Sequence, residues 1–433
     1  MYRRDLEVLD LDDRRELQST RLARLVDRLK QIDNPYWSEK LAPVEEVRSI
    51  EDIRSLPFTE KRDFRDTYPY GMVTVPMEHV VRVHASSGTS GKPTIVAYSA
   101  ADIEVFAEVV ARCLSGAGAT ADDIVQIAYG YGLFTGGLGI HYGVAALGAT
   151  AVPASGGKPG FQVGLMADLG VTGLGATPSF TLLLAEKAEE LGLKDSIRLR
   201  WGLHGAEPWS ESLRAKIEEA WGGGYDAMDI YGLSEVIGPG VAGECLENKG
   251  GLHIMEDHFL AEIVDPETGD PVHEGDPGEL VLTTLTKQAQ PVIRYRTRDI
   301  TRFIPGPCPC GRTTRRMARL EGRADDMLII RGVNVYPRAI EELLMSYREL
   351  GANYAIVVDR RTLLPELEAR VELASESLAG QAEVIAARLQ EQLAETIRLR
   401  ILVKVGAPGS VPRTEMGKAK RVYEQTTDED PLG

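Results

Sequence analysis

The stretch SSGTSGKP, at residues 86–93, combines the residue types that hold an anion. Glycines let backbone N–H groups approach an oxygen closely, and the hydroxyls and Lys92 add further donors. The spacing is not that of a P-loop, because two residues separate Gly88 from Gly91 and a proline follows the lysine. A flexible surface hairpin is the alternative. Apolar runs on both sides place the stretch between two strands, which favours a phosphate-binding loop formed by Ser86, Ser87, Gly88, Thr89, Ser90 and Gly91.

Three of the four cysteines, together with one histidine, have a spacing typical of a metal site. Cys308 and Cys310 lie in the turn GPCPCGR, where two thiolates can face one ion. Cys245 precedes His253 by eight residues, which leaves room for a turn that returns a second pair of ligands. A Cys₃His set is typical of structural zinc and leaves no position open for a substrate. Unrelated loop cysteines are the alternative interpretation, and His258 is a substitute for His253.

The composition limits the class of protein that must carry these residues. The chain has 433 residues, of which 43% are hydrophobic and 26% charged, as expected for a globular protein of two or three domains. Its formal net charge of −16 argues against general binding to nucleic acid or to a membrane surface. The start, MYRRDLEVLDLDD, lacks the apolar core of a signal peptide. Four cysteines in a chain of this length indicate a reducing, cytoplasmic setting.

The order of helical and β-type segments predicts an α/β fold. Residues 1–60 have apolar residues at helical spacing, and residues 80–240 alternate strands with helices, which indicates a layered domain with largely parallel strands. Ser99 and Asp102 form a capping box that opens a helix, and Cys113 lies on its apolar stripe. Short β runs with turn sequences over residues 245–320 predict an antiparallel β subdomain.

Two further segments complete this organisation. Residues 124–157 contain no charged side chain and are long enough to cross a bilayer. Their nine glycines disfavour a membrane helix, and two β-type runs around a helical piece favour a buried unit that lines a pocket. Residues 328–433 read strand–helix–strand–strand–helix–strand, which predicts a small α+β domain. The predicted division is therefore 1–322, a linker at 323–327, and 328–433.

Five more motifs follow the loop in a fixed order: HGAEP (204–208), DIYGLSE (229–235), YRTRD (295–299), GRADD (322–326) and PRTEMGK (412–418). With SSGTSGKP in front, the chain resembles the adenylate-forming enzymes, the acyl-CoA synthetase and ligase superfamily. The stretches YGYGLFTGGLGIHYG, GAEPWSE, DIYGLSEVIGPGVA and DDMLIIRGVNVYP resemble its phenylacetate-CoA ligase branch. Thr94 and Ile95 stand where many relatives have Lys-Gly, a departure that this branch shares.

The resemblance implies a reaction in two halves. A carboxylate first reacts with ATP to give an acyl adenylate and pyrophosphate, and the thiol of coenzyme A then displaces AMP. The loop 86–91 would hold the β- and γ-phosphates, Glu235 would bind Mg²⁺, and Lys418 would stabilise charge at the carboxylate and α-phosphate. Asp325 matches the family's hinge, about which the small domain rotates between the halves.

The resemblance also assigns the nucleotide contacts. Tyr231 would stack on adenine and Asp299 would accept both ribose hydroxyls. The other expected ATP/AMP-binding residues are Gly205, Ala206, Glu207, Pro208, Asp229, Ile230, Gly232 and Ser234.

The charge-free segment would supply the acid pocket, through Tyr129, Tyr131, Phe134 and Gly136. Ordinary core packing is the alternative for each of these four residues. An apolar pocket suits an aromatic acid, with phenylacetate the first choice and benzoate- or aminobenzoate-type acids as alternatives. The acceptor is coenzyme A, or else the phosphopantetheine of a carrier protein. A non-catalytic nucleotide-binding or zinc-containing protein is disfavoured, because the catalytic set is complete. The branch also suggests a homodimer.

Overall fold

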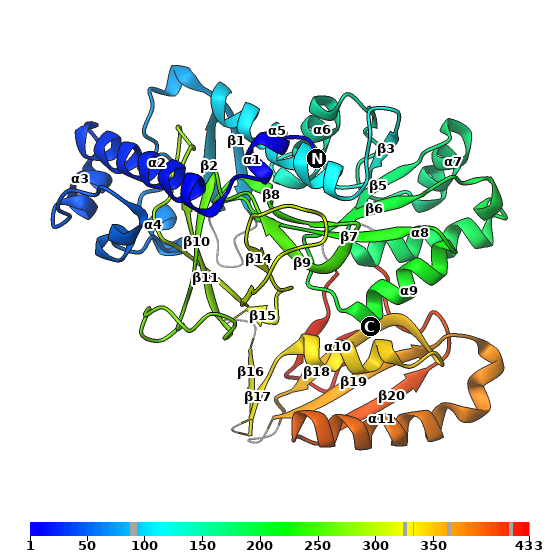
Figure 1. The fold of residues 1–433 in the computed structure, drawn as a ribbon. Coiled ribbons are helices and arrows are strands. Elements are labelled where there is room, and N and C mark those ends of the chain that lie inside the picture. Colours follow the sequence, from blue (N-terminus) through cyan, green and yellow to red (C-terminus); the bar gives the residue numbers. More distant parts are fainter. Residues whose placement is uncertain (87–92, 324–326, 332, 362–364, 415–418, 433) are drawn as a thin grey trace.

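The structure, a computed structural model, describes residues 1–86, 93–323, 327–331, 333–361, 365–414 and 419–432. A large N-terminal part built around a nine-stranded sheet stands above a smaller C-terminal part with its own sheet (Figure 1). The predicted fold class, a large layered α/β unit followed by a small α+β unit, is confirmed.

The nine-stranded sheet has a parallel half and an antiparallel half. Helices α5 and α6 cover one face of it, and α8 and α9 cover the other (Figure 1). The parallel half consists of β3 (Ile124–Ile127), β4 (Thr150–Val152), β5 (Gly173–Ala176), β6 (Trp201–His204) and β7 (Asp226–Leu233). The antiparallel half adds β8 (Gly238–Cys245), β9 (Asn248–Ile254), β14 (Arg316–Met317) and β13 (Phe303–Ile304). The helices are α5 (Ala100–Gly116), α6 (Thr135–Leu147), α7 (Pro159–Leu169), α8 (Pro178–Glu190) and α9 (Glu211–Trp221).

The N-terminal segment is helical, as predicted. Its elements are α1 (Arg4–Glu7), α2 (Leu11–Gln31), α3 (Pro35–Leu41), α4 (Lys61–Asp66) and the 3₁₀ turns η1 (Ile50–Ser55) and η2 (Met77–His79). Asp10 caps α2 by accepting the Asp13 N–H, and the buried side of the helix carries Leu22, Leu25 and Leu29.

A hairpin and a second sheet flank this segment. The phosphate-loop candidate joins β1 (Val80–Ser86) to β2 (Thr94–Ser99), an antiparallel pair, and its residues 87–92 lie outside the described part of the chain. The second sheet is antiparallel, in the order β10 (Phe259–Val264), β11 (Gly278–Thr284), β12 (Tyr295–Thr301) and β15 (Gly322–Arg323). The region 245–320 is thus divided between two sheets, because β9, β13 and β14 extend the antiparallel half of the large sheet.

The charge-free segment forms β3, α6 and β4, as the strand–helix–strand interpretation predicts. Its glycines allow α6 to approach α5 closely. A Cβ atom on Gly143 would lie 2.3 Å from a methyl carbon of Val110, and one on Gly139 would lie 2.5 Å from the Phe106 ring. Within the described residues, no helix combines the length and apolar character needed to cross a membrane. The Ser99–Asp102 capping box at the start of α5 is present, and Cys113 is buried in the core.

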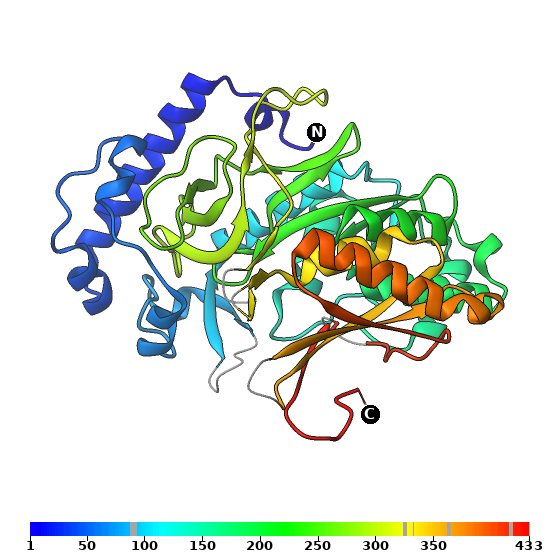
Figure 2. The same cartoon turned by 90° about the horizontal axis from the view of Figure 1, so that it is seen from below.

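The C-terminal part begins with a short hairpin of β16 (Leu328–Ile330) and β17 (Val333–Val335). It continues with α10 (Pro337–Ser346), β18 (Leu350–Asp359), β19 (Glu366–Leu373), the 3₁₀ turn η4 (Glu376–Gln381), α11 (Ala382–Ile397), β20 (Ile401–Gly406) and β21 (Val422–Gln425). The strand order is β20–β19–β18–β21, and α10 and α11 pack beside this sheet (Figure 2). The sequence had predicted this alternation except for β21, a short strand that pairs parallel to β18.

The two parts share an apolar core. Trp209 and Leu213 at the start of α9 pack in one buried cluster with Ile340, Leu344 and Tyr354 of the C-terminal part. This cluster holds α10 against α9, next to the carboxyl ends of β6 and β7.

Candidate active site

A cavity of about 320 Å³ lies where the carboxyl ends of β6 and β7 meet the second sheet and the start of α10. Ligand sites in open α/β sheets occur at this edge, because successive loops meet there. The candidate residues that line it are Ser86, Tyr129, Phe134, Gly136, Gly205, Ala206, Glu207, Pro208, Asp229, Ile230, Tyr231, Gly232, Ser234, Glu235 and Asp299. Sequence motifs separated by more than 200 residues therefore face one space.

Tyr231 and Asp299 meet across the boundary between the two sheets. The Tyr231 hydroxyl donates to a carboxylate oxygen of Asp299 over 2.6 Å. Burial, reinforced by the Asp299 charge, raises the pKa of Tyr231 well above its usual value, so this hydroxyl remains a donor. β15 pairs with β12 and sets Arg323 opposite Asp299, with a guanidinium nitrogen 3.4 Å from the carboxylate.

Glu235 lies at the end of the cavity nearest the phosphate-loop candidate. One of its carboxylate oxygens accepts the Ser86 hydroxyl at 3.2 Å and lies 3.9 Å from the Lys61 Nζ. An almost fully buried carboxylate beside donors of this kind is a ligand type that Mg²⁺ accepts.

The turn 205–208 forms one wall of the cavity. Gly205 donates its N–H to the Tyr129 hydroxyl at 2.9 Å, and a Cβ atom at this position would lie 2.5 Å from the carbonyl oxygen of Ile230. Only glycine therefore allows the turn to lie this close to β7. Ala206 adopts a left-handed conformation, with φ of 70°. The Glu207 carboxylate accepts the Ser179 hydroxyl at 2.7 Å and the N–H of Ala419, from the C-terminal part, at 2.7 Å.

The apolar end of the cavity comes from the charge-free segment. Tyr129, Phe134, Gly136 and Ile140 line it. A Cβ atom on Gly136 would lie 2.6 Å from the Phe134 ring, so glycine lets the aromatic side chain take its observed position. Tyr131, which the sequence placed in the acid pocket, does not line the cavity; its hydroxyl lies 3.3 Å from the His141 Nδ1.

Beside the cavity, Asp229 belongs to a charged cluster whose other members, Glu244, Arg214 and Arg319, the sequence did not indicate. Glu244 accepts two bonds from Arg214, at 2.7 and 2.8 Å, and the N–H of Asp229 at 2.7 Å. Burial raises the pKa of both Asp229 and Glu244 above their usual values, and the Asp229 charge adds to the effect on Glu244. Arg214 contacts Glu244, and the Nε of Arg319 lies 3.6 Å from the Asp229 carboxylate, so two arginines offset the charge of the two carboxylates beside the cavity.

Other cavity residues were also absent from the sequence prediction. They include Lys61, Thr135, Ile140, Trp209, Tyr295, Thr297, Arg319, Arg323, Pro337 and Arg338. Tyr295 and Thr297 lie within a recognised motif, YRTRD, and could have been found from it. Lys418 and the hinge candidate Asp325 lie outside the described residues, as do Ser87, Gly88, Thr89, Ser90 and Gly91.

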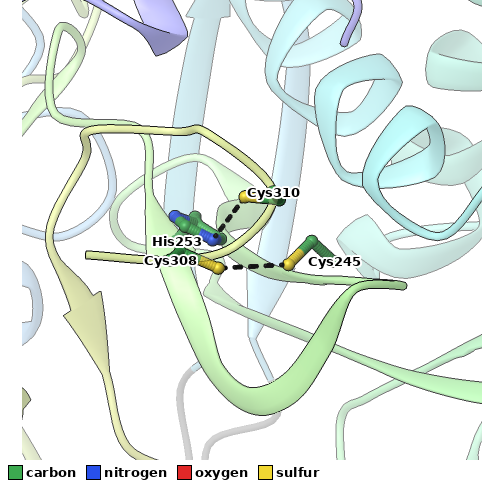
Figure 3. Close-up of side chains that lie close together, drawn as sticks. All are labelled: Cys245, His253, Cys308 and Cys310. Atoms are coloured by element: carbon green, nitrogen blue, oxygen red, sulfur yellow. Dashed lines mark hydrogen bonds between the residues drawn. The ribbon is translucent and has the colours of Figure 1, made fainter. Parts of the chain in front are cut away.

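The predicted metal ligands form a compact cluster where β8 and β9 meet the loop between β13 and β14 (Figure 3). Cys245 ends β8, His253 lies in β9, and Cys308 and Cys310 lie in the loop between β13 and β14. All four ligand atoms lie within 4.8 Å of one another, with 3.6 Å between the sulfurs of Cys245 and Cys308 and 3.4 Å from the Cys310 sulfur to the His253 Nε2. Sulfurs bound to one tetrahedral zinc at about 2.3 Å lie roughly 3.8 Å apart. The geometry thus fits a zinc ion. The histidine in the cluster is His253, whereas His258 lies beside Glu108 and Asp257.

Protonation of two ligands in the cluster suits metal binding, whereas burial and the neighbouring thiols raise the pKa of Cys245. Burial, with the nearby Arg312 charge, lowers the pKa of His253 to about 3, which keeps the imidazole neutral. Burial opposes ionisation of Cys310, but hydrogen bonds from Arg312 outweigh it and lower the pKa of this thiol. The His253 Nδ1 lies 3.2 Å from the Thr314 hydroxyl, a contact of the kind that orients metal-binding imidazoles.

Comparisons with known proteins identify the family of the chain. Residues 11–285 match the family model of the AMP-binding enzymes, and residues 332–426 match the AMP-binding enzyme C-terminal domain. A phenylacetate-coenzyme A ligase from Aromatoleum evansii is 45% identical over 436 residues, which cover 98% of this chain and 98% of the relative. A phenylacetate-coenzyme A ligase from Thermus thermophilus is also 45% identical, over 98% of this chain and 99% of the relative.

Among solved structures, a 2-hydroxyisobutyryl-CoA ligase with 2-HIB-AMP in the postadenylation state aligns with a TM-score of 0.90 and 28% identity, over 97% of this chain and 91% of that one. The same ligase with 2-HIB-AMP and CoA in the thioesterification state aligns with a TM-score of 0.71. The arrangement described here is therefore the more similar to the postadenylation state.

The chain belongs to the AMP-binding, adenylate-forming enzymes. Within that class it belongs to the branch of the phenylacetate-coenzyme A ligases, as the resemblance of its motifs predicted.

Proposed function

We propose that this enzyme is an acid–thiol ligase that joins phenylacetate to coenzyme A and converts ATP to AMP and pyrophosphate. One observation carries the proposal. A single cavity combines an apolar, aromatic end with the Tyr231–Asp299 pair and the Glu235 carboxylate, in a chain related over nearly its whole length to phenylacetate-coenzyme A ligases.

In the first half-reaction, a carboxylate oxygen attacks the α-phosphorus of ATP and pyrophosphate leaves. Tyr231 would pack against adenine in the slot formed with residues 205–208, and the hydrogen bond from its hydroxyl would orient Asp299 to accept the ribose hydroxyls. Ser86 and the rest of the loop to Gly91 would hold the outer phosphates. Glu235 would hold Mg²⁺, which offsets the negative charge of the triphosphate when bound. Lys418 would contact the carboxylate and the α-phosphate.

In the second half-reaction, the sulfur of coenzyme A attacks the acyl carbon and AMP leaves. We assign the division 1–322, 323–327 and 328–433, with Asp325 as the pivot of the small domain between the halves. The closer similarity to the postadenylation state supports a docked arrangement here and a different one for thioester formation.

The apolar end of the cavity favours an aromatic acid. Tyr129 is anchored by hydrogen bonds to Ala176 and Gly205, so its ring is a fixed wall rather than a movable one. Phe134 and Gly136 complete a space without charged side chains. Benzoate- and aminobenzoate-type acids are the alternative substrates, and carrier-protein phosphopantetheine is the alternative acceptor.

We further propose that Cys245, His253, Cys308 and Cys310 hold one structural zinc ion. All four positions of a tetrahedral site would be protein atoms, so this ion would stabilise the fold and take no part in the reaction. It would join the β8–β9 hairpin to the loop before β14. That loop also anchors the N-terminal segment, through Arg312 at 3.2 Å from Glu7.

We place the enzyme in the cytoplasm, because its cysteines are free in the structure and its expected substrates ATP and coenzyme A are intracellular. The homodimer expected from the branch is tested by light scattering of the purified protein.

The experiment is ATP–pyrophosphate exchange over a panel of phenylacetate, benzoate, 2-aminobenzoate and 2-hydroxyisobutyrate. Phenylacetate should support exchange with the highest kcat/KM. A second arm compares free coenzyme A with a phosphopantetheinylated carrier protein as acceptor, and coenzyme A should be the better thiol. A higher kcat/KM for another acid would contradict the proposed substrate. Transfer to the carrier protein alone would contradict coenzyme A as the acceptor.

A further inference from the structure

One glutamate of the C-terminal part reaches the adenine-slot segment of the N-terminal part. Glu341 lies in α10, and one of its carboxylate oxygens accepts the backbone N–H of Ser210 at 2.9 Å. Its other oxygen accepts the hydroxyl of Tyr354, in β18 of the same C-terminal part. Glu341 is 4% exposed and Ser210 is fully buried, so this bond is formed in the absence of water.

The Ser210 N–H belongs to the segment that forms the nucleotide wall. Residues 205–209 line the cavity, and Ser210 ends that segment because its side chain caps α9. Pro337 and Arg338, on the first turn of α10, line the same cavity one helical turn before Glu341. The bond therefore fixes the start of α10 at the mouth of the cavity.

A second contact supports the same docking from the other end of α10. Lys216 of α9 donates to the carbonyl oxygens of Tyr347 and Leu350, at 3.0 and 2.6 Å. Lys216 is partly buried against these carbonyl groups, and this burial lowers its pKa.

Breaking the Glu341 bond while the parts remain docked would be costly. Without an acceptor at residue 341, the Ser210 N–H would be a buried, unpaired donor. If the segment that ends at Ser210 moved away while the parts stayed docked, the Glu341 carboxylate would remain buried without its main-chain donor, which is also unfavourable. Separation of the two parts returns both groups to water, so the bond favours the docked arrangement only.

We propose that Glu341 is a positioning residue for adenylation: its bond to Ser210 docks the C-terminal part against the nucleotide wall and is released for thioester formation. This inference rests on the proposed two-step reaction, and it adds a named contact that favours one of the two arrangements.

Half-reaction kinetics of Glu341→Leu test it. Phenylacetate-dependent ATP–pyrophosphate exchange should fall by about 10–100-fold, the range expected when a buried donor loses its partner. Conversion of supplied phenylacetyl adenylate and coenzyme A to the thioester should stay within about twofold, because the docked arrangement is not needed there. Glu341→Gln keeps an acceptor oxygen and should restore most of the exchange activity.

Glu349→Leu is a comparison variant within the same region. Because Glu349 also interacts with the Lys216 charge, its variant reports any electrostatic effect on the second docking contact, and a neutral control is Glu391→Leu, at an exposed position of α11, which should change neither half-reaction. Lys216→Met removes the second docking contact and should show the same selective loss of exchange in weaker form. If Glu341→Leu does not fold, Lys216→Met tests the inference through the same comparison of pyrophosphate exchange with thioester formation.

Hydrogen–deuterium exchange provides a measurement that needs no substrate. Glu341→Leu should increase exchange in peptides covering 205–213 and 337–346 and leave α2 unchanged. Equal loss of both half-reactions, no loss in either, or unchanged deuterium uptake would overturn the inference. If the wild-type protein catalyses no exchange with any acid, the proposed function fails, and deuterium uptake alone then decides the docking contact.

Discussion

The hydroxyl of Tyr231, at the end of β7, lies 2.6 Å from the carboxylate of Asp299 in β12, and this bond joins the nine-stranded sheet to the four-stranded one. The two residues are 68 positions apart in the chain and lie in the motifs DIYGLSE and YRTRD. Tyr231 thus has two roles in the proposed site, a ring against the base and a donor that orients the carboxylate beneath the ribose.

The first prediction concerns the effect of this pair on the KM for ATP. Asp299→Ala should raise the KM for ATP by at least about 10-fold in pyrophosphate exchange, because hydrogen bonds to a charged group contribute about 1.5–3 kcal/mol each. Tyr231→Phe keeps the ring and loses only the orienting bond, so its effect should be smaller, about two- to fivefold. An unchanged KM for ATP in Asp299→Ala would remove the ribose contact from the account.

Lys418, which lies outside the described residues, makes the second prediction. Lys418→Ala should reduce acyl-adenylate formation by several orders of magnitude, because a charge contact specific to the transition state is lost. Thioester formation from supplied adenylate should largely survive. The neighbouring Lys420→Ala serves as the control and should leave both rates unchanged. A parallel fall of both half-reactions in Lys418→Ala contradicts the assigned role.

The third prediction concerns zinc. Protein purified without added metal should contain about one zinc per chain by elemental analysis, and Cys308→Ser or Cys310→Ser should lose it. Cys113→Ser is the matched control. Cys113 is buried on the apolar side of α5, so its substitution should not affect the zinc content. Zinc loss should also increase proteolysis of the N-terminal segment, which is held to the cysteine loop through Glu7 and Arg312. Protein without zinc, or zinc retained in both loop variants, would exclude the site.

The fourth prediction concerns His204, which lies immediately before the turn 205–208. Its Nδ1 lies 3.0 Å from the Ala176 carbonyl oxygen and its Nε2 lies 2.9 Å from the Tyr225 hydroxyl. Burial lowers its pKa from 6.5 to about 4. Between these two pKa values, His204 is protonated in the unfolded chain but neutral in the folded protein. The free energy of unfolding therefore falls as pH drops from about 6.5 to about 4, by up to about 3 kcal/mol.

Chemical denaturation across this pH range measures the effect. The decline should be smaller in His204→Gln than in the wild-type protein, and substitution of the exposed His79 by Gln should leave it unchanged. An identical decline in His204→Gln and wild type would show that His204 does not contribute.

Local patterns in the sequence predicted much of the fold. The capping box at Ser99 and Asp102, the strand–helix–strand unit of the charge-free segment and the alternation in the C-terminal part all depend on neighbours along the chain. The division of residues 245–320 between two sheets could not be predicted in this way. It depends on β9 pairing with β14, and that pairing is set by tertiary packing.

The site shows the same distinction. Motif order indicated Tyr231, Glu235 and Asp299, which line one cavity. Arg319 and Glu341 carry no local signal, because their partners come from distant segments and are known only after folding. Tyr131 does not line this cavity, and the pattern of tyrosines and glycines after β3 does not say which ring faces it.

The central claim is tested most directly by identifying the products with phenylacetate, ATP, Mg²⁺ and coenzyme A. The account predicts phenylacetyl-CoA, AMP and pyrophosphate in equal amounts, measured by mass spectrometry and nucleotide chromatography, with no thioester when the acid or ATP is omitted. Formation of ADP in place of AMP, or release of AMP without any phenylacetyl-CoA, would contradict it.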